Sequence, residues 1–86
     1  MLIEEGGILM KIELVFNEEA LSRIEETDKT IEEAKKYYCG HYFNLGEKNN
    51  PYIDKVIIMY VYDDNGNIIK RYNEWGKEFE KTWFGK

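Results

Sequence analysis

The sequence has few of the residues that mark secreted, membrane-spanning or metal-binding proteins. It contains one cysteine, which excludes an internal disulfide, together with one histidine and one proline. It has no apolar run of the about 18 residues that a membrane-spanning helix needs. Its first residues lack the basic end and long apolar core of a secretory signal. These absences favour the reducing cytoplasm and no contact with a membrane.

The sequence also lacks the common patterns of catalysis and cofactor binding. It has no phosphate-binding glycine loop, no dinucleotide-binding fingerprint and no zinc-protease helix motif. The single Cys39 and His41 lie in the stretch YYCGHYF, but zinc needs about four ligands. A Cys–His nucleophile needs the imidazole within hydrogen-bond reach of the sulfur. The stretch is more typical of a helix end capped by Gly40. We therefore predict no metal, cofactor or catalytic residue, and an enzyme using Cys39 and His41 is the least favoured alternative.

Acidic side chains are concentrated in the first part of the chain. The formal net charge is −5, which disfavours nonspecific attraction to nucleic acid as the overall mode of binding. Residues 1–33 carry ten acidic and three basic side chains, whereas residues 34–86 carry seven and nine. The excess indicates either a solvated helix face or an acidic surface for a basic partner. The residues of that surface would be Glu18, Glu19, Glu25, Glu26, Asp28, Glu32 and Glu33.

Residues 1–9 are interpreted as an extension produced by a misplaced start codon. Reverse translation of Glu-Gly-Gly at residues 5–7 gives a plausible ribosome-binding site at a suitable distance before Met10. The richness in Lys, Asn, Ile and Tyr is typical of an AT-rich genome. The expected domain is then residues 10–86. In the alternative, the apolar residues of the extension belong to the fold and the glycine pair is a flexible joint.

The first half of the domain is predicted to contain one strand and one or two helices. Residues 10–16 alternate between apolar and charged side chains, which is typical of a half-buried strand. Asn17 is expected to cap a first helix. The apolar stripe of that helix is formed by Ala20, Leu21 and Ile24. Thr30 and Glu33 match a capping box for a second helix, which Gly40 would end in a left-handed conformation.

The second half is predicted to contain a loop, a hairpin and a short helix. Residues 44–52 are rich in Asn and Gly and are expected to form the loop. Strands over residues 56–62 and 67–73 flank a turn in which Gly66 takes a positive φ. The stretch DDNGN has its glycine in the wrong position for a calcium loop. One apolar side of the final helix would be formed by Trp75, Phe79 and Trp83.

These elements predict a single α+β domain of order β-α-(α)-β-β-α, with a three-stranded sheet covered by packed helices. The strand of residues 10–16 has two alternative positions. Beside residues 56–62 it would be parallel, with a right-handed crossover, and beside residues 67–73 it would be antiparallel. Residues 56–62 are apolar on both faces, so the second face needs a cover. The final helix or a second copy of the chain would provide it.

The leading functional hypothesis is a small non-enzymatic binding or regulatory protein, from a bacterial mobile element, that acts through protein–protein contact. Its partner is unknown, and a homodimer through the sheet is one expectation. One version is an acidic inhibitor that imitates nucleic acid. The alternative is a nucleic-acid-binding module built on the basic and aromatic hairpin. The hairpin residues in question are Tyr60, Tyr62, Lys70, Arg71 and Tyr72.

Overall fold

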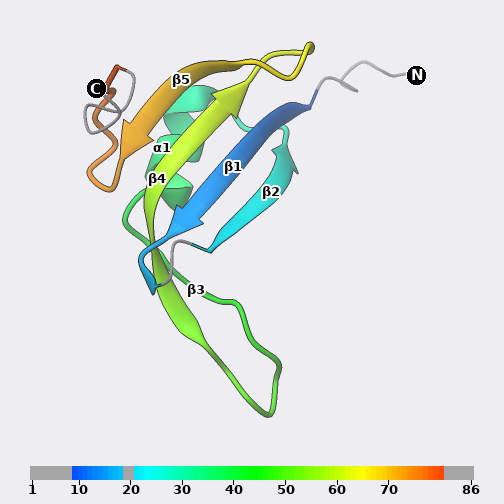
Figure 1. Ribbon diagram of the computed structural model, residues 1–86, viewed down its shortest axis with the longest axis vertical. Coiled ribbons are helices and arrows are strands. Elements are labelled where there is room, and N and C mark those ends of the chain that lie inside the picture. Colours follow the sequence, from blue (N-terminus) through cyan, green and yellow to red (C-terminus); the bar gives the residue numbers. More distant parts are fainter. Residues whose placement is uncertain (1–8, 19–20, 81–86) are drawn as a thin grey trace.

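The computed structural model of the chain describes residues 9–18 and 21–80, and within them strands predominate (Figure 1). The predicted extension over residues 1–9 therefore falls almost entirely outside the described residues. In chain order the elements are β1 (Met10–Phe16), β2 (Ser22–Thr27), α1 (Ile31–Tyr38), β3 (Tyr42–Asn44), β4 (Ile53–Tyr62) and β5 (Ile68–Asn73).

The five strands form one curled antiparallel sheet, so the expectation of a three-stranded sheet with packed helices is wrong. The order across the sheet is β2-β1-β4, and β4 pairs with β3 through its first residues and with β5 through its last. Of the two predicted positions of β1, the one beside residues 56–62 is confirmed, but the predicted parallel direction is wrong because β1 runs antiparallel to β4. The cause is β2, which adds a reversal of chain direction between β1 and α1 (Figure 1).

The predicted first helix is replaced by the hairpin of β1 and β2. Residues 22–27 form six residue pairs with residues 10–15. The expected apolar stripe is poorly buried, since Leu21 is 41% exposed and Ile24 is 52% exposed. A helix of about ten residues is marginal without a buried face, so strand pairing overrides the helix-favouring composition. Two residues of the predicted helix, Glu19 and Ala20, lie outside the described part of the chain.

The predicted second helix is confirmed as α1. The Thr30 hydroxyl accepts from the Glu33 backbone N–H at 3.2 Å, and the Glu33 carboxylate accepts from the Thr30 N–H at 3.0 Å. This is the expected capping box. Gly40 follows the helix with a φ of +76°, as predicted, and its N–H donates to the Val56 carbonyl at 2.9 Å. Gly40 thus connects the end of α1 directly to β4.

The hairpin of β4 and β5 is also confirmed, with Gly66 at a φ of +86° in its turn. The predicted final helix is not, because the chain reverses at residues 73–76 instead. The Asn73 side-chain oxygen accepts from the N–H groups of Trp75 and Lys77, and Gly76 has a φ of +75°. The Phe79 N–H donates to the Arg71 carbonyl, so residues 77–79 run back along β5. The third aromatic of the predicted helix, Trp83, lies outside the described residues.

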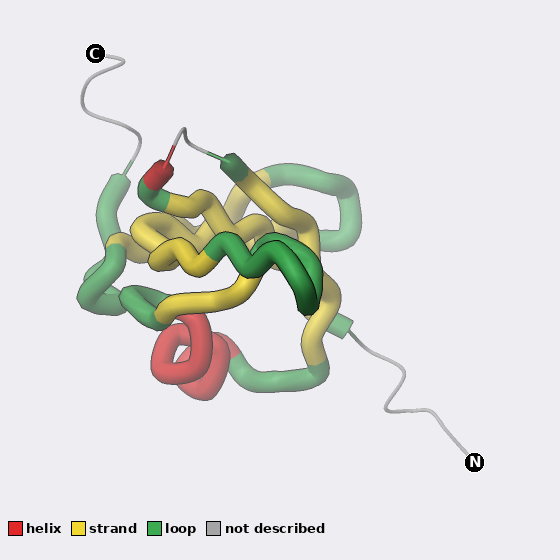
Figure 2. Tube along the Cα trace, turned by 90° about the horizontal axis from the view of Figure 1, so that it is seen from below, coloured by secondary structure: helices red, strands yellow, loops and turns green. Residues whose placement is uncertain are grey.

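The hydrophobic core lies between α1 and one face of the sheet (Figure 2). The alternation predicted for β1 is confirmed, because Ile12, Leu14 and Phe16 are at most 1% exposed. Val56, Met59 and Val61 of β4 face the same layer, which Ala34 and Tyr38 of α1 close from the other side. Further core members are Cys39 and Tyr72. The result is a flat molecule with extents of 41 × 40 × 21 Å.

The hairpin of β3 and β4 projects beyond this body as an arm (Figure 1). The Asn44 side-chain oxygen accepts from the N–H groups of Gly46 and Tyr52, which fixes the loop that was predicted over residues 44–52. Tyr42 is 65% exposed and Ile53 is 55% exposed, so the arm has little core of its own.

Candidate interaction surface

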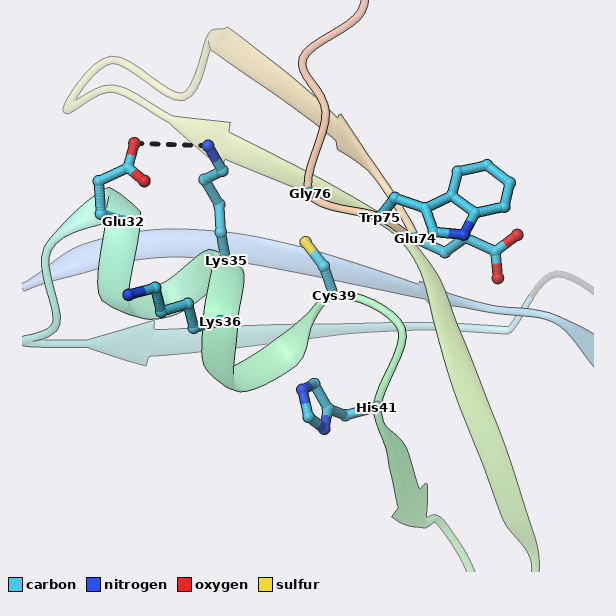
Figure 3. A pocket seen from close by; sticks show the side chains of 8 residues that line it. All are labelled: Glu32, Lys35, Lys36, Cys39, His41, Glu74, Trp75 and Gly76. Atoms are coloured by element: carbon cyan, nitrogen blue, oxygen red, sulfur yellow. Dashed lines mark hydrogen bonds and ion pairs between the residues drawn. The ribbon is translucent and has the colours of Figure 1, made fainter.

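Cys39 and His41 line a shallow depression beside the end of α1, but they point in different directions (Figure 3). Cys39 is 8% exposed, and its backbone N–H donates to the Lys35 carbonyl at 3.1 Å. His41 is exposed on the segment that leads into β3. The other lining residues are Glu32, Lys35, Lys36, Glu74, Trp75 and Gly76. Both acidic lining residues form ion pairs, Glu32 with Lys35 and Glu74 with Lys55.

The chemistry of this depression is that of a buried thiol beside charged side chains. Burial raises the pKa of Cys39 to about 11, while the nearby Lys35 lowers it by a smaller amount. At neutral pH the sulfur is therefore protonated, and a thiol is a poor nucleophile and a poor metal ligand. Within residues 9–18 and 21–80 no three His, Cys, Asp or Glu side chains form a group that could hold a metal ion.

The acidic residues singled out in the sequence do not form one helix face, because five of them precede α1. Glu25 and Glu26 are neighbours in β2 and point to opposite faces of the sheet. Glu25 pairs with Arg23 at 3.4 Å. Glu33 is occupied as the helix cap. Glu18, Asp28 and Glu32 are exposed, and Glu19 lies outside the described residues. Contact with a basic partner stays a prediction.

The basic and aromatic residues of the β4–β5 hairpin are divided between the two faces of the sheet. Tyr72 is 5% exposed in the core, and the Lys35 ammonium lies 4.8 Å from its ring centroid. Lys70, two positions away on the same side, pairs with Glu78 at 3.2 Å. Arg71 lies between them in sequence and is opposite Tyr60 across the strand pair, so both are on the other face.

That other face of the sheet is the candidate interaction surface, and we call it the open face. Its residues alternate with core residues along each strand, and the strand register brings them together. Every described element other than α1 is a strand of the sheet, and α1 covers the core side. No described helix or strand covers the open face (Figure 2). Its residues include Lys11, Glu13, Val15, Ile24, Glu26, Ile58, Tyr60, Tyr62, Arg71 and Phe79.

Polar contacts organise the middle of the open face. The Tyr62 hydroxyl donates to the Glu13 carboxylate at 2.5 Å, and this bond is the main reason why the pKa of Tyr62 is raised to about 12. The Lys11 ammonium lies 5.5 Å from the centroid of the Tyr62 ring. No carboxylate in the described residues forms an ion pair with Arg71. The middle of the face therefore carries one engaged acid and one unpaired guanidinium, on opposite sides of β4.

The sequence analysis singled out Tyr60, Tyr62 and Arg71 of this face as one group, and Glu26 as part of another. Glu13 and Lys11 are the charged positions of the predicted β1 pattern, so the alternation already placed them opposite the core. Ile24 and Phe79 were assigned to helices, and their position on the sheet depends on pairings that no local pattern indicates.

No helix in the described part of the chain has the length and apolarity needed to cross a membrane. Neither a family model, nor a curated protein, nor a solved structure matches this chain.

Proposed function

We propose that this chain is a small non-catalytic binding protein of the cytoplasm that acts through protein–protein contact, with the open face as its contact surface. The observation that carries the proposal is the composition of β4. Ile58, Tyr60 and Tyr62 alternate with core residues, yet no described helix or strand covers them. Rigid aromatic side chains with a polar tip are enriched in protein interfaces. An uncovered sheet face of this kind supports an interaction site there.

A nucleic-acid-binding function has less support. A platform for single strands combines stacking aromatics with a groove of positive charge. On the open face the cations Lys11 and Arg71 are balanced by the acids Glu13 and Glu26. The remaining hairpin cation, Lys70, lies on the other side of the sheet and is paired with Glu78.

Affinity capture from host extract, with and without nuclease treatment, tests the proposal. The wild-type chain should retain a protein partner after nuclease treatment, and Tyr60→Glu should lose it, since a charge is then placed in the centre of the face. Lys36→Glu is the matched control, because Lys36 is exposed on α1 and remote from the open face. Loss of the captured protein after nuclease treatment would favour the nucleic-acid alternative. Equal capture by Tyr60→Glu and the wild type would contradict the proposed surface.

A further inference from the structure

We infer that the occupant of the open face is a second copy of this chain, packed face to face about a two-fold axis that runs along β4. The inference rests on the proposed function, because it names the partner of the same surface. A two-fold interface is self-complementary, so each feature on one side of the axis needs a matching feature on the other side. The open face meets this condition in an unusual detail, the sequence of side chains across its central row.

The central row crosses five neighbouring segments of the sheet. The strand register aligns Ile24 of β2 with Glu13 of β1, Glu13 with Tyr60 of β4, and Tyr60 with Arg71 of β5. The bridge between Tyr72 and Glu78, together with the bond from the Phe79 N–H to the Arg71 carbonyl, adds Phe79 at the end. The two sides of the row correspond to each other. Next to Tyr60 is a charged residue, which is acidic on the β1 side and basic on the β5 side. Beyond each charged residue is an apolar side chain.

A two-fold axis along β4 exchanges the two halves of this row. Glu13 then lies over the partner's Arg71, and Ile24 lies over the partner's Phe79. Tyr60 packs against the partner's Tyr60, on the axis. The alternative two-fold axis, across the strands, would stack Glu13 on the same residue of the second copy, and juxtaposed like charges are costly. The charge pattern therefore suits a second copy in the first orientation and disfavours the second orientation.

The side chains suit the spacing of such a packing. Aligned sheets pack about 10 Å apart at an angle of roughly 30°, so only long side chains span the gap away from the axis. Glu13 and Arg71 each lie one strand away from β4. The guanidinium has no ion-pair partner in residues 9–18 and 21–80 and provides several further donors. Each dimer would contain two such pairs.

The size of the open face predicts a weak dimer. Four strand spacings of about 4.8 Å and about five residues at roughly 3.3 Å each give a face of roughly 19 by 16 Å. That projected area, roughly 300 Å², is well below the about 800 Å² that each partner contributes to a standard interface. The dissociation constant of the dimer should therefore be about micromolar or higher, and a single measurement at low concentration would detect only the monomer.

Sedimentation equilibrium of the whole chain, over a range of about 5 to 500 μM, tests the inference. The wild type should shift from monomer to dimer within this range. Glu13→Arg and Arg71→Glu should each weaken self-association by about tenfold or more, because each substitution creates two like-charge contacts. An equimolar mixture of these two variants should associate again, since both contacts of the mixed dimer are then attractive. The double variant carrying both substitutions should also form a homodimer, with the charges exchanged.

Two controls keep the result specific. Lys36→Glu reverses a charge on the exposed side of α1, away from the open face, and it should dimerise as well as the wild type. Circular dichroism checks that every variant is folded.

A wild type that stays monomeric at all concentrations, or a double variant that stays monomeric while the wild type dimerises, would overturn the inference. If the wild type is monomeric but Tyr60→Glu still loses a captured protein, the proposed function stands and only the second copy is rejected. If the charge variants change neither self-association nor capture, the open face is not an interface and both proposals fall.

Discussion

The two faces of β4 are built from the same run of apolar and aromatic residues but are stabilised by different interactions. On the covered face, Val56, Met59 and Val61 are at most 1% exposed and pack beneath α1. On the open face, Tyr60 and Tyr62 are half-buried among charged neighbours, and one of them is fixed by a hydrogen bond. Hydrophobicity along a strand therefore does not reveal how much each residue contributes to the free energy of unfolding. The position of a residue relative to α1 indicates the size of that contribution.

The largest expected effect comes from shortening Met59, which is fully buried on the covered face. Met59→Ala should lower the free energy of unfolding by about 4 kcal/mol, through lost burial and the cavity left behind. Ile58→Ala, one residue away on the open face, should cost about 1 kcal/mol in the monomer. Urea denaturation at low protein concentration measures both values without a contribution from self-association.

A loss at Ile58 as large as that at Met59 would break the distinction between the faces. It would mean that the open face is already covered in the monomer. A repeat of the Ile58→Ala measurement at high concentration is the control. Any additional loss that appears only there belongs to an interface.

The second prediction concerns Gly40, which connects α1 to the sheet and so keeps the covered face closed. Its φ is +76°, and a Cβ atom there would clash with the Glu74 carbonyl oxygen. Gly40→Ala should cost about 2–3 kcal/mol, because backbone strain and a clash with main-chain atoms act together. Gly66→Ala is the matched control, since its φ is +86° but a Cβ atom at that position would meet no other atom within 4 Å. Its cost should be about 1 kcal/mol, from backbone strain alone.

Thermal denaturation of the two glycine variants gives a direct comparison. Equal losses of stability in the two variants would show that the contact with Glu74 is readily relieved. The junction between α1, β4 and the end of β5 would then be more easily deformed than its geometry implies.

The parts of the fold that could be predicted from the sequence are those set by local rules. The alternation of β1, the capping box of α1 and the turn at Gly66 each depend on residues close in the chain, and all three are confirmed. The failures concern β2 and the segment after β5. Residues 22–27 have a helix-favouring composition and bury only Thr27, so nothing local marks them as an edge strand. Pairing with β1 decided their structure.

The open face shows the same division. That β4 is apolar on both sides was visible in the sequence, and so was the need for a second cover. The central row was not visible, because it brings together residues from Ile24 to Phe79 through four separate pairings. Register is set by the whole sheet, and a shift of one residue in any strand would exchange its two faces.

The third prediction uses the thiol of the covered face as a reporter of burial. Burial raises the pKa of Cys39 from 9.0 to about 11. Below pH 9 the thiol is protonated in both the folded and the unfolded chain, and its contribution to stability is complete. Between pH 9 and about 11 the unfolded chain loses its proton first, so stability falls as the pH rises. Urea denaturation across this range should show a steeper fall for the wild type than for Cys39→Ala.

Reaction with a thiol reagent at about pH 8 provides an independent check. Native Cys39 should react slowly, and the chain in urea should react rapidly, because burial both protonates and shields the sulfur. Rapid labelling of the native chain would place Cys39 outside the core.

The smallest expected effect separates the two faces through two tyrosines with raised pKa values. On the open face, the pKa of Tyr62 is raised to about 12, first by the hydrogen bond to Glu13. On the covered face, the pKa of Tyr38 is raised first by burial and then by the charge of Glu25. Glu13→Gln should therefore return the pKa of Tyr62 most of the way to its ordinary value of 10.0, and Glu25→Gln should lower that of Tyr38 only slightly.

Titration of the tyrosine rings by NMR measures both values in each variant, so that each substitution serves as the control for the other. The hydrogen bond is half-exposed, so its loss should cost no more than about 1 kcal/mol of stability. Because the pKa of Tyr62 lies above that of the free side chain, its contribution is present at neutral pH and is lost only as the pH rises through about 12. If Glu13→Gln leaves Tyr62 unchanged, burial rather than the hydrogen bond raises its pKa. In that case the open face of the monomer would be shielded from water as the face beneath α1 is, and the difference between the two faces of β4 would disappear.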